Sequence, residues 1–250
     1  MYSIKYCTLL LTSSLVLFSC GSSSSGPSTA LQANTSMSEA SSMFSSMSEV
    51  SKMRSYLSFA DTKIATSDLS VQQQDLLKLC QKTVTSNGDP NHNISQITIG
   101  GAGCPISYSL NADGKRSGGQ SDAVLQFNYR VVNANFASIT DIQAADCTAN
   151  VSVNESSQSS MSISSHLACQ IDSKSRGIMH ISLNLKFENS ASGRTVAMDA
   201  TLDIGGKVAI ASVTSQTPAG GATTNVVLVN GQASTENIDL SSFSSIAYSP

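Results

Sequence analysis

The feature that most constrains this fold is the alternation of apolar and polar residues from residue 94 onward. In residues 161–171 the apolar side chains occupy odd positions, namely Met161, Ile163, Leu167, Cys169 and Ile171. Strict alternation has the period of a β-strand with one buried face. Similar runs recur between turn signals and predict an antiparallel meander with strands near 94–100, 104–110, 122–133, 138–152, 161–171, 177–188, 194–204, 207–214 and 224–231.

The spacing of these runs also predicts how neighbouring strands align. A slip of one residue would move the apolar set of a strand to the other face, so the alignment that keeps the set together is favoured. Folding 138–152 back around Gln158 pairs Val153 with Ile163, Ala149 with Leu167 and Cys147 with Cys169. Across the DSKSRG turn the apolar odd positions meet again, and the next hairpin pairs Phe187 with Val196, Leu185 with Met198, Leu183 with Ala200 and Ile181 with Leu202. Three successive hairpins therefore share one apolar face, which other elements must cover or close.

Two amphipathic helices are predicted ahead of the sheet and are the available cover. Ser36 and Glu39 have the spacing of a capping box, and apolar residues then recur at steps of three and four: Met37, Ala40, Phe44, Met47, Val50, Met53, Leu57 and Ala60. We expect one helix over 37–60 and a second over about 71–84. Methionines also line adaptable binding surfaces, but they more often fill gaps in a core, and we favour packing here.

These patterns predict an α+β fold that is mostly β. We expect residues 36–250 to form one domain, an antiparallel meander of about nine strands covered by one or two N-terminal helices. Such a sheet either stays open or curves into a half-barrel. Gly205-Gly206 has the chemistry of a two-residue hairpin turn of the primed type.

The first twenty residues, MYSIKYCTLLLTSSLVLFSC, have the layout of a secretory signal peptide. Lys5 is the only charge before Cys20, and an apolar run extends from Leu9 to Phe18. This run is shorter than the roughly 20 apolar residues of a membrane span. Residues 1–19 are therefore predicted to be a signal peptide, and the Ser- and Gly-containing residues 20–35 a flexible tether.

Leu17-Phe18-Ser19-Cys20 resembles the lipobox of bacterial lipoproteins, with Phe18 where a small residue is usual. The resemblance implies cleavage after Ser19, attachment of diacylglycerol to the Cys20 thiol and acylation of the new amino terminus by a chain such as palmitate. Gly21, rather than Asp, follows Cys20. Under the Gram-negative sorting rule attached to this family, that implies the outer membrane, on either its periplasmic or its surface side. From the residues alone, an ordinary secretory signal with a chance cysteine, or an uncleaved anchor, are the alternatives.

Four cysteines are left once Cys7 departs with the signal peptide and Cys20 is lipidated: Cys80, Cys104, Cys147 and Cys169. An even number in an exported protein indicates two disulfides, with three connectivities open. The strand alignment places Cys147 and Cys169 on one face at cross-strand spacing, which is compatible with a disulfide. The pair that is then left, Cys80 and Cys104, would join the second helix to the early strands. A zinc site is not expected, because the chain has no C-x-x-C motif.

The sequence offers few groups for chemistry. His166, His180, Asn184, Asp199 and Asp203 fall on the polar face of neighbouring strands, which we interpret as a solvated surface rather than a metal site or an acid–base pair. NADGK at 111–115 lacks the other ligands of a calcium loop and is predicted to be a polar turn. The glycine-rich stretch 100–103 leads into a strand, so we expect a hairpin turn there and not a phosphate cradle. With no G-x-S-x-G elbow or phosphate loop, we expect neither an enzyme nor a bound metal or cofactor.

The charge balance argues against nucleic acid as a partner. The chain has 14 Lys and Arg against 17 Asp and Glu, a net charge of −3, and no basic cluster. We therefore expect a non-enzymatic outer-membrane lipoprotein with a structural or interaction role, bound to the membrane by its anchor and to an envelope protein.

The alternative is a carrier of a lipid or another apolar ligand. A curved sheet covered by helices is similar in outline to the half-barrel lipoprotein-sorting proteins of bacterial envelopes, although no motif is shared. A carrier would keep a cavity of several hundred Å³ between helices and sheet. A structural domain would fill that space at the density of a protein interior.

Overall fold

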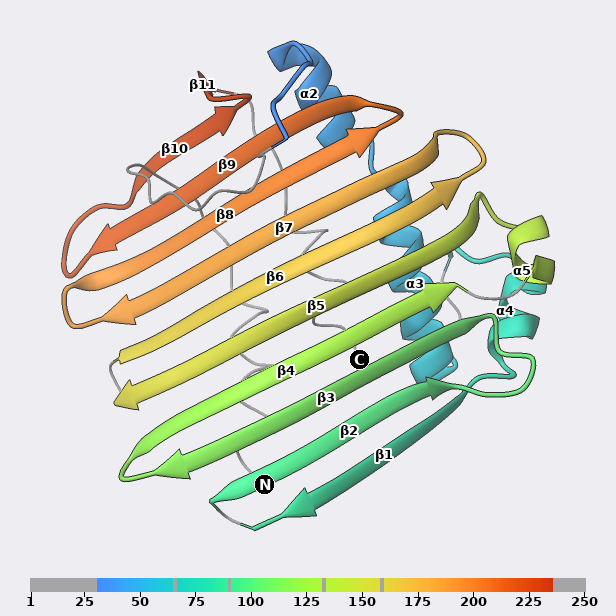
Figure 1. The fold of residues 1–250 in the computed structure, drawn as a ribbon, viewed down its shortest axis with the longest axis horizontal. Helices are drawn as coiled ribbons and strands as arrows, with labels where there is room; N and C mark the ends of the chain where they lie inside the picture. Colours follow the sequence, from blue (N-terminus) through green and yellow to red (C-terminus); the bar gives the residue numbers. More distant parts are fainter. Residues whose placement is uncertain (1–30, 65–66, 90, 132–133, 158–159, 236–250) are drawn as a thin grey trace.

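The computed structural model describes residues 31–64, 67–89, 91–131, 134–157 and 160–235. Its main element is one antiparallel sheet of eleven strands whose order in space follows their order in the chain (Figure 1). The strands are β1 (Gln81–Gly88), β2 (His92–Gly100), β3 (Ile106–Ser117), β4 (Gln120–Val131), β5 (Ile142–Ser157), β6 (Ser160–Ser173), β7 (Gly177–Ser190), β8 (Gly193–Ile204), β9 (Lys207–Pro218), β10 (Thr224–Val229) and β11 (Gln232–Ser234). The sheet is not closed, because β1 and β11 do not pair with each other. The prediction of a mostly β antiparallel meander is confirmed, with eleven strands in place of about nine.

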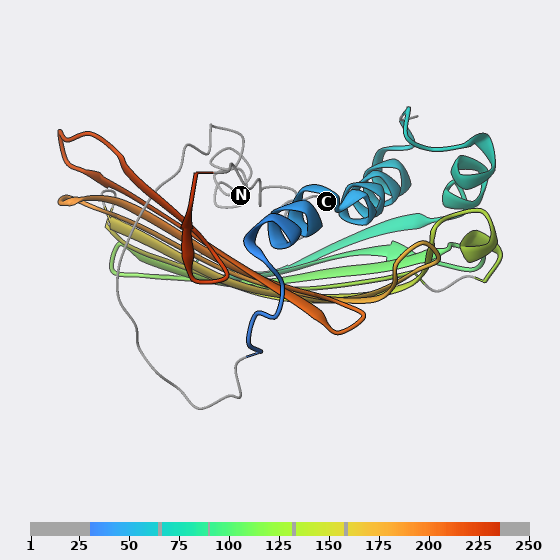
Figure 2. The same ribbon diagram turned by 90° about the horizontal axis from the view of Figure 1, so that it is seen from above.

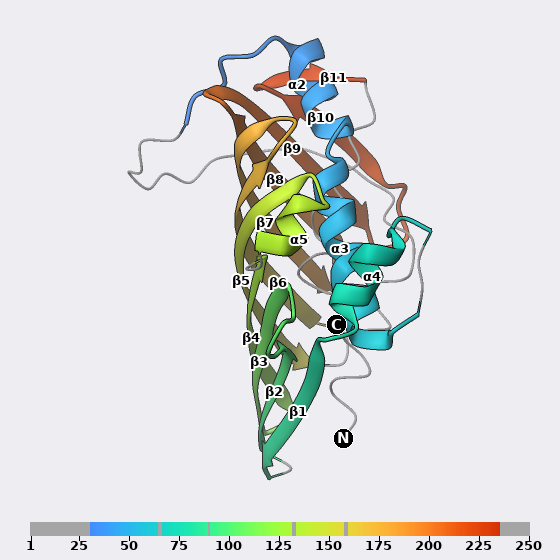
Figure 3. The same cartoon turned by 90° about the vertical axis from the view of Figure 1, so that its right-hand side faces the viewer.

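Helices cover one face of the sheet. They are α2 (Met37–Ser45), α3 (Ser48–Thr62), α4 (Val71–Leu77) and the short α5 (Ala134–Ser138). In Figures 2 and 3, α2 and α3 cross the strands on the same side of the sheet, and α4 stands next to α3 near β1. We call the face toward these helices the inner face, and the opposite one the outer face. The helices lie over one end of the strands, and the other strand ends extend beyond them (Figure 2).

The predicted alignments of the middle strands are confirmed. Val153 pairs with Ile163, and Cys147 with Cys169, between β5 and β6. Between β7 and β8 the register runs from Phe187–Val196 through Leu185–Met198 and Leu183–Ala200 to Ile181–Leu202. The turn after β8 uses Gly205 and Gly206 at φ values of 59° and 84°. A type I′ turn needs positive φ at both central residues, and two glycines meet that need without strain.

The predicted helix over 37–60 is two helices. The break falls at Ser46 and Met47, the latter at φ −80° and ψ 70°, which is not helical. The first helix begins as predicted, since the Ser36 side chain accepts a hydrogen bond from the backbone N–H of Glu39. The apolar stripe continues through both helices because each keeps its own apolar side on the sheet: Ala40, Phe44, Val50, Met53, Leu57 and Ala60 are buried.

The second predicted helix, over 71–84, is wrong in its second half. The helix begins at a capping box formed by Ser70 and Gln73 but ends at Leu77. Residues 81–88 instead form β1, which pairs along its whole length with β2. The run Thr83-Val84-Thr85 is β-branched, and such residues favour strands over helices.

Other parts of the sheet also differ from expectation. Residues 111–115 lie inside β3, and the turn comes at Gly118 and Gly119 instead. The strand predicted from 138 begins at Ile142, because α5 precedes it. At the C-terminal side, β9 extends to Pro218 and the short β11 was not predicted.

Aromatic side chains fill the space between helices and sheet. Tyr56, Phe59, Tyr129 and Phe136 are at most 1% exposed. The rings of Tyr56 and Phe136 meet edge to face, with centroids 4.8 Å apart. Fully burying a side chain of this size contributes roughly 1.5–3 kcal/mol, so these residues anchor the helices on the sheet.

Candidate functional site

Both predicted disulfides are present. Cys147 and Cys169 join neighbouring strands β5 and β6, with Cα atoms 4.1 Å apart. Cys80 and Cys104, with Cα atoms 4.6 Å apart, join the end of the α4 segment to the β2–β3 turn. The first pair was predictable because strand register fixes which side chains meet. Cys20 lies outside the described residues.

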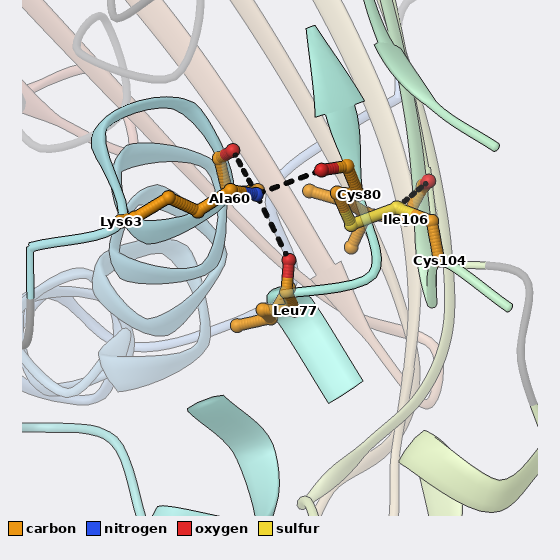
Figure 4. Close-up of a disulfide and its surroundings, with 6 residues drawn as sticks. All are labelled: Ala60, Lys63, Leu77, Cys80, Cys104 and Ile106. Atoms are coloured by element: carbon orange, nitrogen blue, oxygen red, sulfur yellow. Dashed lines mark hydrogen bonds between the residues drawn. A yellow bond between two sulfur atoms is a disulfide. The ribbon is translucent and has the colours of Figure 1, made fainter. Parts of the chain in front are cut away.

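A lysine organises the region of the second disulfide. Lys63 ends α3 at a φ of 60°, and its Nζ donates hydrogen bonds to the carbonyl oxygens of Ala60 at 2.8 Å, Leu77 at 3.2 Å and Cys80 at 2.8 Å (Figure 4). Burial lowers the pKa of this ammonium group. The amine satisfies carbonyls at two helix ends, so its role here is structural. The sequence carried no signal for this cluster, because the three carbonyl partners are backbone atoms.

A buried ion pair fixes the break between α2 and α3. The Glu49 side chain is 1% exposed, and its Oε1 lies 3.0 Å from Nε of Arg176 in the β6–β7 turn. Nη1 of Arg176 donates to Oγ of Ser46 at 3.1 Å, and Nη2 donates to the Ser46 carbonyl oxygen. One guanidinium therefore holds both the C-cap residue of one helix and the first turn of the next. Sequence reasoning missed this pair, because nothing local relates Glu49 to Arg176.

The polar residues of the outer face lie as predicted but do not gather into a reactive site. His166 and His180 are exposed on neighbouring strands, and His166 Nδ1 lies 2.8 Å from Oδ1 of Asn184. Asp203 is paired with His180 in the ladder, but its Oδ1 accepts a hydrogen bond from the N–H of Gly206 at 2.9 Å. The polar groups in these contacts therefore stabilise the exposed face of the sheet and the turn after β8.

An open, shallow depression lies over this part of the outer face. Its volume is about 440 Å³, and its lining includes Leu31, Asp146, Gln170, His180 and Asp203. Within the described ranges, no cluster of three or more His, Cys, Asp or Glu side chains has the geometry to hold a metal ion. The carboxylate of the NADGK stretch is also engaged, since Asp113 Oδ1 lies 2.9 Å from Nε2 of His92.

The feature that sequence reasoning did not single out is an apolar strip on the inner face. Beyond the helix-covered ends, one ladder row aligns Ala123, Val153, Ile163, Phe187 and Val196 across β4 to β8. All five are partly exposed, whereas their inner-face neighbours nearer the helices, such as Leu167 and Leu183, are buried. We call this row the open strip. The alternating pattern predicted its face but not its exposure, because exposure depends on how far the helices reach.

A cation lies at one end of the open strip. The guanidinium carbon of Arg194 sits 5.2 Å from the centre of the Phe187 ring, a cation–π distance. Arg194 itself is exposed. The strip therefore presents aliphatic and aromatic surface with a positive charge beside it.

The helix-covered half of the inner face differs from the open strip, because there the helices and the sheet are in direct contact. The Tyr129 hydroxyl on β4 donates to the carbonyl oxygen of Met53 on α3 at 3.4 Å, and both residues are at most 1% exposed. The methionines confirm the packing interpretation, since Met47 and Met53 are buried and Met37 and Met43 pack against the core.

Comparison with known proteins supplies no relative: neither a protein-family model nor a curated protein nor a solved structure matches the chain. The described part of the chain also has no helix whose length and apolar character would let it cross a bilayer.

Proposed function

We propose that this protein is a non-enzymatic lipoprotein of the outer membrane, held there by acyl chains on Cys20, and that the open strip is its contact surface for an envelope partner. The observation that carries the contact surface is the partial exposure of Ile163, Phe187 and Val196 on the same face whose helix-covered part is buried. Contiguous exposed apolar surface bordered by polar residues marks interaction sites in soluble domains. The anchor is supported by the Leu17–Cys20 sequence and the Ser-containing tether that follows it.

The non-enzymatic role is supported by what the polar groups do. Glu49 and Arg176 pair with each other, Lys63 binds backbone carbonyls, and Asp203 accepts from a turn amide. Each of these groups stabilises the fold through the contact that it makes. A catalytic centre needs a nucleophile, a base and a stabilising donor set around a space for substrate.

A second candidate function, an apolar-ligand or lipid carrier of half-barrel type, is favoured by the same strip. A ligand between helices and sheet would have to displace side chains such as Met53 and Tyr129, which are already buried there. The open strip offers apolar surface without that displacement. In this version an acyl chain would lie along Ile163 and Phe187, with an anionic group near Arg194.

Fractionation of a Cys20→Ala variant of the full chain tests the anchor. We expect the variant to leave the membrane fraction or to accumulate unprocessed in a Gram-negative host. A variant that matures normally and still sediments with the outer membrane contradicts lipidation at Cys20.

Mass spectrometry of solvent extracts separates the two roles. The wild-type protein, an Ile163→Gln variant on the open strip and a matched Thr201→Gln variant on the outer face are purified in parallel. A lipid that accompanies the wild type and Thr201→Gln but is lost from Ile163→Gln supports the carrier. Absence of bound lipid from all three supports the interaction role, and equal amounts in all three contradict a ligand site on the strip.

A further inference from the structure

The two edges of the sheet differ in how far their backbone N–H and C=O groups are covered. At the C-terminal edge β11 has three residues, and the part of β9 that β10 leaves unpaired is closed by asparagines. Asn34 donates its backbone N–H to the Val208 carbonyl oxygen at 3.1 Å and accepts from the Val208 N–H through Oδ1 at 2.7 Å. Asn230 does the same for Ile210, at 2.8 Å and 2.9 Å. Short edge strands and covered backbone groups are the means by which proteins prevent edge pairing.

The opposite edge, β1, lacks these protections. All eight residues of β1 are exposed, and the strand contains no proline. Its one charged side chain, Lys82, is already paired with Oδ1 of Asp61 on α3 at 2.5 Å. Figure 3 shows β1 as the outermost strand at its end of the sheet. A strand of this length with an open edge is a template for another strand.

The hairpin geometry identifies which backbone groups of β1 point away from β2. Asp89 and His92 exchange both backbone hydrogen bonds at the β1–β2 turn, at 2.7 Å and 3.3 Å. Along an antiparallel ladder, successive residues direct their N–H and C=O groups to opposite sides of the strand. The odd-numbered residues of β1, like Asp89, therefore bond to β2. The even-numbered residues Lys82, Val84 and Ser86 therefore direct their N–H and C=O groups toward the open edge.

We propose that β1 pairs antiparallel with β1 of a second copy of this chain, about a two-fold axis at Val84. Two antiparallel edge strands of identical chains are related by a two-fold axis normal to the sheet. Residues directly opposite each other must have their side chains on the same face, so the axis must lie between one residue and its own copy. With the axis at Val84, Val84 faces its own copy, Lys82 faces Ser86, and Thr83 faces Thr85. Lys82, Val84 and Ser86 then form three facing pairs, and each pair exchanges two hydrogen bonds.

The sequence of β1 favours its own copy as the occupant. Thr83-Val84-Thr85 reads the same in both directions, so the axis brings β-branched residues opposite β-branched residues. The same alignment keeps the two Lys82 side chains apart, and like charges directly opposite each other would be destabilising. Moving the axis to Thr85 would place Val84 opposite Ser86 and would use Gly88, whose φ of 135° departs from strand geometry.

Disulfide trapping with the full chain tests both the pairing and its register. A Val84→Cys variant brings its thiol opposite the same thiol of its copy, within the Cα separation that a disulfide allows. We expect it to form a covalent dimer under mild oxidation, and a mixture of Thr83→Cys and Thr85→Cys proteins to form a heterodimer. Thr83→Cys alone lies diagonal to its copy and should stay monomeric on a non-reducing gel.

The matched control is Val124→Cys, at an outer-face position on β4 whose native side chain is 45% exposed, compared with 59% for Val84. If Val84→Cys cross-links no more than Val124→Cys, the proposal is wrong. Light scattering of the detergent-solubilised wild type over a concentration series gives an independent measurement. A monomeric mass throughout would also overturn it.

A proline variant separates pairing from folding. Val84→Pro removes an N–H that faces the open edge, which an edge strand tolerates. We expect loss of the dimer with little change in melting temperature. A dimer that persists in Val84→Pro means that the contact lies elsewhere on the molecule.

Discussion

Leu183 and His180 lie three residues apart on β7 and face opposite sides of the sheet. Leu183 is 1% exposed on the inner face, and His180 is exposed on the outer face. Leu183→Ala should lower the free energy of unfolding by roughly 2–5 kcal/mol, because it removes buried methylenes and leaves a cavity. His180→Ala should change it by less than about 0.5 kcal/mol. Thermal melts of the two variants measure this difference, and the reverse order would mean that the faces are assigned the wrong way round.

Arg176 and Arg130 provide a matched pair of ion-pair deletions. Arg176→Ala would leave the Glu49 carboxylate buried without its cation and would remove two hydrogen bonds to Ser46. We expect a loss of about 2–4 kcal/mol, below the roughly 3–5 kcal/mol for fully buried pairs because Arg176 keeps some contact with water. Arg130→Ala breaks an exposed pair with Asp146 and should cost less than about 1 kcal/mol. Chemical denaturation compares the two, and equal losses would show that the Glu49 pair does not hold the helix break.

At the scale of elements, the two disulfides join different kinds of segment. Cys147 and Cys169 link strands that are already paired along their length, whereas Cys80 and Cys104 link the α4–β1 junction to the β2–β3 turn. Losing a native disulfide costs roughly 2–5 kcal/mol. We expect the Cys147→Ala/Cys169→Ala double variant to fall at the lower end, because its ladder and hydrogen bonds remain.

The Cys80→Ala/Cys104→Ala variant should fall at the upper end of that range. This disulfide joins segments that are not neighbours in the sheet, and the strand that follows Cys80 adds little packing, since every residue of β1 is exposed. Urea denaturation of both double variants gives the comparison. A larger loss for the Cys147–Cys169 variant would indicate that β1 and α4 are held mainly by other contacts, among them the Lys63 amine.

At the scale of the whole molecule, three tyrosines are buried in the core, namely Tyr56 on α3, Tyr108 on β3 and Tyr129 on β4. Burial raises the pKa of Tyr56 and Tyr108, and it raises that of Tyr129 well above the ordinary value of 10.0. A raised pKa in the folded state means that the folded protein keeps protons that the unfolded chain has lost. This contribution to stability is fully present below about pH 10, the pKa of unfolded tyrosine, and is lost as the pH rises above it.

The free energy of unfolding should therefore fall above about pH 10, by up to roughly 1.4 kcal/mol per pH unit for each such tyrosine. In Tyr129→Phe this dependence should be shallower, while the stability near pH 8 changes little because the hydroxyl makes one long hydrogen bond, 3.4 Å to Met53. Urea denaturation at a series of pH values measures the slope. An identical slope in Tyr129→Phe would show that Tyr129 ionises freely in the folded protein.

The sequence by itself determined the middle of the sheet. Between residues 142 and 204 the faces, the register and the Cys147–Cys169 pair follow from period-two alternation and from glycine turns. Both signals are local, because a strand's side-chain direction and a primed turn's φ values depend on adjacent residues. The beginning of the helix at Ser36 was predictable for the same reason, since a cap is a contact over three residues.

Only the tertiary structure decided the features that depend on distant partners. Arg176 contacts Ser46 at the break in the long apolar helix. Residues 111–115 extend a strand in place of the expected turn because they pair with β2. Whether residues 81–88 form a helix or an edge strand depends on β2 being available to pair with them. The open strip likewise exists because the helices end before Ile163 and Phe187, and alternation alone cannot tell a covered apolar face from an uncovered one.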